Sequence, residues 1–132
     1  MRNRTLLRAA AAVGLAVSAV AMSTGAATAA EKNGYLTSGE FGLFCFQNQA
    51  NSVFDLYVSD ANFTNDVFKG SQSCAGHTTN DWTESYLNLD TYEWSVHTNS
   101  SRGGTAGYIP AGYRGNASAN FKNTISSAYI VW

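Results

Sequence analysis

The sequence is poor in several residue types, and each shortage argues against a class of protein. It has a single proline but seventeen aromatic residues, a composition that excludes a disordered chain. Charged residues make up only 13% of it, and the two histidines lie 20 positions apart. No apolar run reaches the roughly 20 residues that a membrane-spanning helix needs. What remains is a chain with the length and the aromatic content of one small globular domain.

The first thirty residues have the pattern of an export signal. Three arginines precede an apolar run from Ala9 to Met22, and a segment of small residues follows. A basic start, a short apolar middle and an A-x-A-like end are typical of a secretory signal peptide. We therefore expect residues 1–30 to be a signal peptide, cut after Ala29 or Ala30. Residues 31–132 would then form one secreted, extracellular domain, and the alanine-rich signal indicates a bacterial protein.

Residues 31–132 are acidic overall. They carry five basic and nine acidic side chains, which leaves a net charge of −4. A nucleic-acid-binding protein would need a basic patch to displace counterions, and no basic amphipathic stretch points to a membrane surface. We expect no nucleic-acid partner, no membrane partner and a monomer.

The two cysteines, Cys45 and Cys74, predict one disulfide bond. An even pair in an oxidising compartment usually forms a bond, and a domain of about 100 residues has a core small enough to benefit from one. A metal or redox pair is the alternative, but the 28 intervening residues match no C-x-x-C spacing.

The pattern of residues 31–132 predicts an all-β fold. Gly, Asn, Ser and Thr interrupt the chain at the spacing of about 8 to 12 residues that is typical of sandwiches and barrels. In the clearest strand, Trp94 and Val96 share the face expected to enter the core, and His97 is expected to face solvent. A turn with residues that tolerate positive φ is expected at Asn48–Asn51. The expected strands are Phe41–Phe46, Ser52–Ser59, Tyr92–Asn99, Thr105–Ile109 and Ala128–Trp132.

The two halves of this region repeat one order of pieces. Each runs through an aromatic strand, a polar turn, a second strand, a long connection and an Asn/Ser-rich segment. The two Asn/Ser-rich segments are Asn80–Ser85 and Lys122–Ser127. Two copies of a four-stranded antiparallel unit predict a pair of Greek keys packed as a sandwich.

The stretch from Tyr92 to Val131 resembles a known family. It combines an aromatic strand, the turn Asn99–Gly104, the bend Tyr108–Gly112 and the segment Phe121–Ser127. In these residues the chain resembles the βγ-crystallin-type domains of secreted actinobacterial proteins, and more narrowly the streptomycete metalloproteinase-inhibitor family. The resemblance implies a βγ-crystallin-like sandwich of two Greek keys and inhibition of an extracellular metalloprotease by binding. It identifies no inhibitory loop, because no stretch matches one residue by residue.

The same family has a calcium signature: two acidic or amide residues, two free positions, Ser or Thr, and then Ser. Both Asn/Ser-rich segments depart from it, because Glu84 stands at a hydroxyl position and Lys122 at an oxygen position. Carboxylate, amide and hydroxyl oxygens suit calcium, so the resemblance implies a weak or degenerate site and no required cofactor. The alternative is a polar turn whose side chains bond to their own backbone. The site would contain Asn80, Asp81, Glu84, Asn123 and Ser126.

Enzyme chemistry has little support in the sequence. His77 and His97 form no H-E-x-x-H pair, and no G-x-S-x-G elbow is present. Asp81 and Glu84 could act as a glycosidase carboxylate pair, but a turn or a cation site accounts for them more simply. We therefore expect a protein that is not an enzyme and acts by binding.

Two kinds of binding protein remain open. The first is the peptidase inhibitor that the resemblance implies. The second is an extracellular calcium- or carbohydrate-binding module, or a killer-toxin-like protein, on the same scaffold. Aromatic side chains that could stack on sugars, or fill the core instead, are Trp82, Tyr86, Tyr92, Trp94, Tyr108 and Tyr113.

Overall fold

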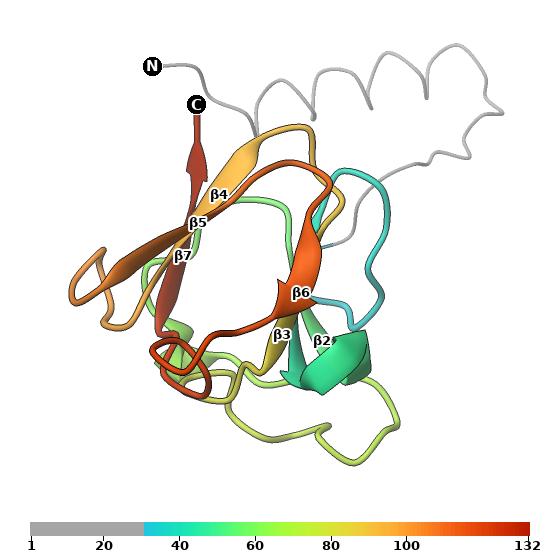
Figure 1. Cartoon of the computed structure of the whole chain (residues 1–132). Coiled ribbons are helices and arrows are strands. Elements are labelled where there is room, and N and C mark those ends of the chain that lie inside the picture. The colour runs from blue at the N-terminus through green and yellow to red at the C-terminus, as the bar shows by residue number, and fades with distance from the viewer. Residues whose placement is uncertain (1–30) are drawn as a thin grey trace, which may run out of the picture. The chain divides into compact units, whose positions relative to one another are not determined.

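Two antiparallel β-sheets make up the part of the chain that the computed structural model describes, residues 31–132 (Figure 1). The expected signal peptide, residues 1–30, lies outside the described residues. The all-β sandwich predicted from the sequence is confirmed. Sheet A has the order β2 (Ala50–Leu56), β1 (Phe41–Phe46), β3 (Ser85–Asn88) and β6 (Arg114–Asn116). Sheet B has the order β5 (Ala106–Ile109), β4 (Glu93–His97) and β7 (Ser127–Val131).

The predicted strands are present, with some differences in their bounds. β1 has the predicted limits, whereas β2 begins and ends earlier than the expected strand Ser52–Ser59. The expected turn between them is a short 3-10 turn, η2 (Gln47–Gln49), with positive φ at Asn48 (61°) and Asn51 (69°). A second 3-10 turn, η3, covers Phe63–Asn65. β3 and β6 are not predicted by the sequence pattern, because both are short and neither alternates strictly between buried and exposed residues.

Each half of the chain forms one Greek key, and the two keys exchange a strand. β1, β2 and β3 come from the first half, but β6 from the second half completes sheet A by pairing with β3. In sheet B, Asp60 from the first half pairs with Ala128 of β7 through backbone hydrogen bonds of 2.8 and 3.0 Å. Neither sheet is complete without residues from both halves, so the two keys form one folding unit.

Two serines hold equivalent turns in the two halves. Ser85 Oγ donates a hydrogen bond of 2.6 Å to the carbonyl of Phe46, at the end of β1. Ser127 Oγ donates one of 2.8 Å to the carbonyl of Asn99, just beyond β4. These serines are the last residues of the two Asn/Ser-rich segments, so the repeat seen in the sequence corresponds to a repeat in three dimensions.

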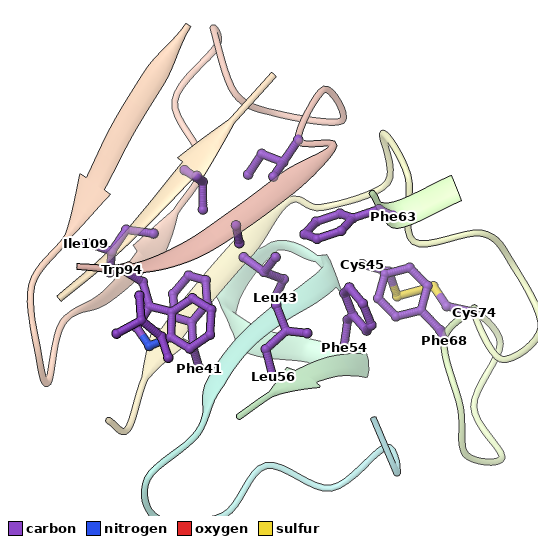
Figure 2. Packing of buried hydrophobic residues seen from close by; sticks show 14 residues of the cluster. Phe41, Leu43, Cys45, Phe54, Leu56, Phe63, Phe68, Cys74, Trp94 and Ile109 are labelled. Atoms are coloured by element: carbon purple, nitrogen blue, oxygen red, sulfur yellow. A yellow bond between two sulfur atoms is a disulfide. The ribbon is translucent and has the colours of Figure 1, made fainter. Parts of the chain in front are cut away.

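Aromatic and aliphatic side chains from both sheets fill the space between them (Figure 2). Phe41 of β1 and Trp94 of β4 stack with their ring centroids 4.8 Å apart, and both are fully buried. Val96 is also buried, as predicted for this face of the strand. The indole N–H of Trp94 donates to Asp90 Oδ2 over 2.8 Å, which satisfies its hydrogen-bonding capacity inside the core.

The predicted disulfide is present between Cys45 of β1 and Cys74, with an S–S distance of 2.09 Å. Both cysteines are buried in the hydrophobic cluster that also contains Phe54 and Phe68 (Figure 2). The bond therefore ties the long connection after β2 directly to the core.

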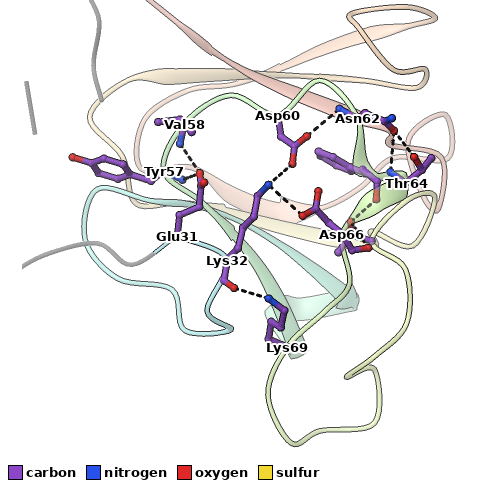
Figure 3. A network of polar contacts seen from close by, with 11 residues as sticks. Glu31, Lys32, Tyr57, Val58, Asp60, Asn62, Thr64, Asp66 and Lys69 are labelled. Atoms are coloured by element: carbon purple, nitrogen blue, oxygen red, sulfur yellow. Dashed lines mark hydrogen bonds and ion pairs between the residues drawn. The ribbon is translucent and has the colours of Figure 1, made fainter. Parts of the chain in front are cut away.

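The segment before β1, residues 31–39, is fastened across sheet A as a strap (Figure 3). Glu31 Oε1 accepts two backbone N–H bonds of 2.8 Å from the residues that follow β2. Lys32 Nζ forms ion pairs of 2.9 Å with Asp60 and 3.2 Å with Asp66. The strap is thus held by charged groups near the point where the two halves exchange strands.

Farther along the strap, a buried carboxylate and a glycine hold it flat on the sheet. Asp55 accepts hydrogen bonds from the N–H groups of Asn33 (3.0 Å) and Gly34 (2.8 Å), and its burial raises the pKa of the Asp55 carboxyl. The side chain of Leu36 lies on Gly42 of β1, where an added Cβ would come within 2.8 Å of Leu36 Cδ2. The strap therefore covers the face of sheet A that points away from the core.

Loss of the disulfide should lower the melting temperature by more than about 10 °C. The bond joins residues 29 positions apart, and a loop of this size is worth about 3 to 4 kcal/mol in the chain-entropy model. One kcal/mol corresponds to about 4 to 8 °C for a domain of this size. Thermal unfolding with and without reductant measures the effect, and the Cys45→Ala/Cys74→Ala double variant should not respond to reductant. Two free thiols in the unfolded, unreduced protein would contradict the bond.

Candidate functional site

The two Asn/Ser-rich segments lie against each other and exchange backbone hydrogen bonds. The N–H of Asp81 donates to the carbonyl of Ile125 over 3.0 Å, and the N–H of Asn123 donates to the carbonyl of Thr83 over 2.7 Å. The second residue of each segment thus pairs with the fourth residue of the other. Asp81 and Asn123 both have positive φ, 64° and 57°, which Asp and Asn adopt more readily than most residues.

The structure brings four of the five predicted calcium ligands together as two side-chain pairs. Ser126 Oγ donates to Asp81 Oδ1 over 3.1 Å, and Asn123 Nδ2 donates to Glu84 Oε2 over 3.2 Å. The fifth residue, Asn80, has a buried Oδ1 with no hydrogen-bond partner among the described residues. Each pair joins one residue of the first segment to one of the second.

The first pair fits a hard cation and the second does not. The first pair consists of a carboxylate and a hydroxyl, and the residue before Asp81 in the chain, Asn80, has a buried and unpaired amide oxygen; all three are kinds of atom that calcium prefers. At the second pair, an amide N–H already occupies Glu84, and exposed Lys122 adds a positive charge next to Asn123 in the sequence. Within residues 31–132, no group of three or more His, Cys, Asp or Glu side chains is arranged to hold a metal ion.

A second feature, which the sequence did not identify, is the loop from Phe68 to His77, called here the Cys74 loop (yellow-green in Figure 1). Its ends are clamped by two backbone bonds, from Phe68 N to His77 O (2.9 Å) and from Gly76 N to Phe68 O (2.8 Å). The flanking residues Val67 and Thr78 form a β-bridge. Residues 69–73 are all exposed.

The middle of the Cys74 loop is also fixed. Besides the disulfide, the side chain of Asn51 accepts a hydrogen bond from Cys74 N and donates one to Ser73 Oγ, both over 3.0 Å. Near its start, Lys69 Nζ donates to the carbonyl of Lys32 over 3.1 Å (Figure 3). An exposed loop anchored at its base and its centre loses little conformational freedom when a partner binds.

Trp82 links this loop to the first Asn/Ser-rich segment. Its ring stacks on the imidazole of His77, with centroids 4.6 Å apart and planes inclined by 21°. It remains 39% exposed. Exposed tryptophans are over-represented among the residues that dominate binding at protein interfaces.

His97 is buried, so the prediction that it faces solvent is wrong. Its side chain does point away from the core, but its Nε2 lies 2.9 Å from Ser95 Oγ and its ring packs edge-on against Tyr129. Arg102 extends over the Tyr129 ring at 3.8 Å from the centroid. Burial and the charge of Arg102 lower the pKa of His97, and its Nδ1 has no partner among the described residues. The alternation of apolar and polar residues along one strand cannot predict this burial, because the residues that cover His97 are distant in the sequence.

The six aromatic residues considered as a sugar-binding platform have different environments. Trp94 lies in the core, and Tyr86 and Tyr92 are half-buried against it. Tyr108 and Tyr113 are exposed, at 61% and 59%, and Trp82 is engaged by His77. Trp94 therefore cannot contribute to a surface that stacks on sugars.

Solved structures with the same arrangement are βγ-crystallin domains. One, from work on the evolution of the eye-lens βγ-crystallin fold, has a TM-score of 0.59 and 12% identity over 79% of this chain and 92% of that chain. The βγ-crystallin of Ciona intestinalis has a TM-score of 0.54 and 14% identity over 70% and 100%. The N-terminal domain of Protein S has a TM-score of 0.52 and 16% identity over 70% and 96%. The chain thus has a βγ-crystallin-like fold.

At these identities the likeness concerns the fold alone. A scan of protein-family models and a search of curated proteins both find no match. Among residues 31–132, no helix has the length and apolar character needed to cross a membrane.

His97 should lower the free energy of unfolding as the pH falls below about 6.5, whereas the raised pKa values of Glu40, Asp55 and Asp66 act in the opposite direction. Because the pKa of His97 is lowered in the folded protein, the unfolded chain takes up the proton first, with a slope of at most about 1.4 kcal/mol per pH unit. The stabilisation is fully present above the unfolded pKa and is lost toward the folded pKa. Urea unfolding between pH 7 and pH 5 measures it.

One variant isolates this contribution. His97→Phe should remove the part of the pH dependence that His97 contributes. An unchanged slope in His97→Phe would show that His97 does not titrate differently in the two states.

Proposed function

We propose that the protein is a secreted, non-catalytic inhibitor of an extracellular metalloprotease and that the Cys74 loop is the part that enters the target's cleft. The observation that carries this proposal is the anchoring of an exposed loop at three points. These are its clamped base, the buried disulfide at Cys74 and the hydrogen bonds that the Asn51 side chain accepts from Cys74 N and donates to Ser73 Oγ.

The physical argument concerns the entropy of binding. A flexible loop that enters a protease cleft must be ordered on binding, at a cost of about 0.5 to 1.5 kcal/mol for each immobilised side chain. The backbone around Ser73 and Cys74 is already fixed, so this cost is reduced. The stacked pair of His77 and Trp82 beside the loop supplies an aromatic anchor of the kind that stabilises protein complexes.

The βγ-crystallin-like fold supports the same proposal indirectly. The resemblance to the streptomycete metalloproteinase-inhibitor family rests on residues Tyr92 to Val131, and the fold agrees with what that resemblance implies. Secretion, which the first thirty residues predict, would place the protein with extracellular peptidases.

An inhibition titration against a secreted bacterial metalloprotease tests the proposal. Activity should fall linearly to near zero at one equivalent of the protein, with and without added calcium. The variant Ser71→Gly/Gln72→Gly loosens the exposed tip and should raise the inhibition constant at least tenfold with little change in melting temperature.

The matched control is Ala119→Gly/Asn120→Gly, which makes the same kind of change in another exposed turn. This variant should inhibit like the wild type. Equal weakening by both variants would exclude the Cys74 loop as the inhibitory element, and no inhibition by the wild type would exclude this function for the protease used.

A second function, weak calcium binding by a βγ-crystallin-type module, is favoured by the unpaired Oδ1 of Asn80 beside Asp81 and Ser126. These residues would hold the ion, which would link the two Asn/Ser-rich segments electrostatically. We expect binding in the millimolar range typical of loosely charged extracellular sites, or none.

The variant Lys122→Asp should bind calcium more tightly, because it replaces a cation with an oxygen ligand at the position where the family signature has one. Arg114→Asp makes the same charge change on β6 and serves as the control. Isothermal titration compares the three proteins. Micromolar binding by the wild type would show that Lys122 does not oppose calcium.

A further inference from the structure

The turns after β1 and β4 are equivalent, and they place Gln49 and Arg102 at corresponding positions. The N–H of Gln49 donates to Ser85 Oγ over 2.9 Å, and the N–H of Arg102 donates to Ser127 Oγ over 3.4 Å. Both residues have positive φ, 54° and 65°. Since side chains rarely adopt this conformation, the turns must hold it against strain.

The two side chains are used differently. Gln49 Nε2 donates to the carbonyl of Gly115 over 3.1 Å, so this side chain helps to join β6 to the first turn. Arg102 instead lies over the ring of Tyr129, with its guanidinium carbon 3.8 Å from the centroid. It is exposed, and among residues 31–132 no acidic side chain pairs with it. Gln49 therefore uses its side chain in a hydrogen bond within the domain, whereas Arg102, at the equivalent position, presents a positive charge at the surface.

A row of contacts beneath Arg102 fixes the ring on which it lies. Ser95 Oγ bonds to His97 Nε2 over 2.9 Å, and His97 packs edge-on against Tyr129 with centroids 5.5 Å apart. Tyr129 is also paired with Ser95 across β4 and β7. Arg102 therefore rests on a ring that a buried polar pair holds in place.

The turn that carries Arg102 is fixed as well. Backbone bonds join Asn99 N to Gly103 O (3.1 Å) and Ser101 N to Ala61 O (2.8 Å). Gly104 has a φ of 72°, and an added Cβ there would lie 2.2 Å from Thr98 Oγ1. Only glycine fits this position, so the turn has little freedom to move Arg102 away from the ring.

We propose that Arg102, held over the ring of Tyr129, is a binding site for a carboxylate group. A guanidinium presents a planar fork of N–H donors that matches the two oxygens of a carboxylate, and contact with the ring restricts the movement of that fork before the ligand arrives. His97 and Ser95 act as positioning residues, because they hold the ring rather than the ligand.

The outer face of sheet B indicates what the carboxylate is attached to. Tyr108 of β5 pairs with Ser95 from the side opposite Tyr129 and is 61% exposed. Each tyrosine lies within about 5.5 Å of Ser95 at Cβ, so an exposed aromatic side chain lies two strands away from the Tyr129 ring on the same face. The site thus favours a carboxylate on a flat or apolar group, either a free aromatic acid or the end of a protein chain.

Titration with benzoate, followed by NMR signals of the Arg102 side chain and the Tyr129 ring, tests the site. Arg102→Gln should weaken binding at least tenfold. Arg102→Lys, which keeps the charge but not the fork, should weaken it at least fivefold. Arg114→Gln removes the same charge from β6 and should change the affinity less than twofold. Tyr129→Phe should bind like the wild type, whereas Tyr129→Leu should bind as poorly as Arg102→Gln.

Two comparisons separate a specific site from general attraction of anions. Benzamide, which has the ring without the charge, should not bind, and chloride at equal ionic strength should not displace benzoate. Displacement by chloride, or equal loss in Arg114→Gln and Arg102→Gln, would overturn the proposal. Melting temperatures confirm that each variant is folded.

A peptide ending in Phe, with a free or an amidated C-terminus, distinguishes the two sources of the carboxylate. Tighter binding of the free-acid peptide than of benzoate supports the site and identifies a protein chain end as its ligand. Tighter binding of benzoate supports the site and identifies a small aromatic acid. Equal binding of the amidated and free-acid peptides would contradict recognition of a carboxylate. None of these outcomes depends on whether the protein inhibits a peptidase.

Discussion

The stack of Phe41 on Trp94 is the interaction around which the two sheets are arranged. Burying the indole brings a large gain from the hydrophobic effect, but it also buries an N–H that would cost about 1 to 3 kcal/mol if left unpaired. Asp90 supplies the acceptor, and that buried carboxylate in turn accepts the N–H of Thr91 over 2.7 Å. Asn88 completes the connection by donating to the carbonyl of Ile109 over 3.0 Å. The link between the two Greek keys therefore both satisfies the buried indole N–H, through Asp90, and ties β3 to the end of β5, through Asn88.

The exchange of strands places both Asn/Ser-rich segments at the junction of the two keys. Because β6 joins sheet A and Asp60 joins sheet B, residues more than 40 positions apart, such as Asp81 and Ser126, come within hydrogen-bond distance. A cation at this junction would bridge the two halves of the chain. In this protein Asn123 and Glu84 already form one of the two bridges directly, so the junction is closed by its own side chains on that side.

Sequence patterns predicted the features that depend on residues close together in the chain and on residue types. Alternation placed Trp94 and Val96 in the core, residue types that tolerate positive φ marked the turn around Asn48, and the count of cysteines predicted the disulfide. The features that were missed depend on contacts between distant residues. His97 is buried because Tyr129 and Arg102 cover it. The Cys74 loop is rigid because Asn51, from another strand, bonds to its centre. The family signature did indicate which segments meet, but not which of their side chains pair.

The approximate symmetry of the two keys explains why equivalent positions in the two halves have different roles. Each position of the fold occurs twice, so a side chain that makes a structural contact in one half can have a counterpart in the other half that makes no such contact. The first outer face, around Gly42, is covered by the strap, and the corresponding residue in the second sheet is Ser95, which supports a histidine instead. In the first turn, the side chain of Gln49 donates a hydrogen bond to the backbone of β6, whereas in the second turn Arg102 lies at the surface. The side chain of Arg102 is therefore available for binding, because the turn that carries it is held by a serine hydroxyl and a glycine rather than by that side chain.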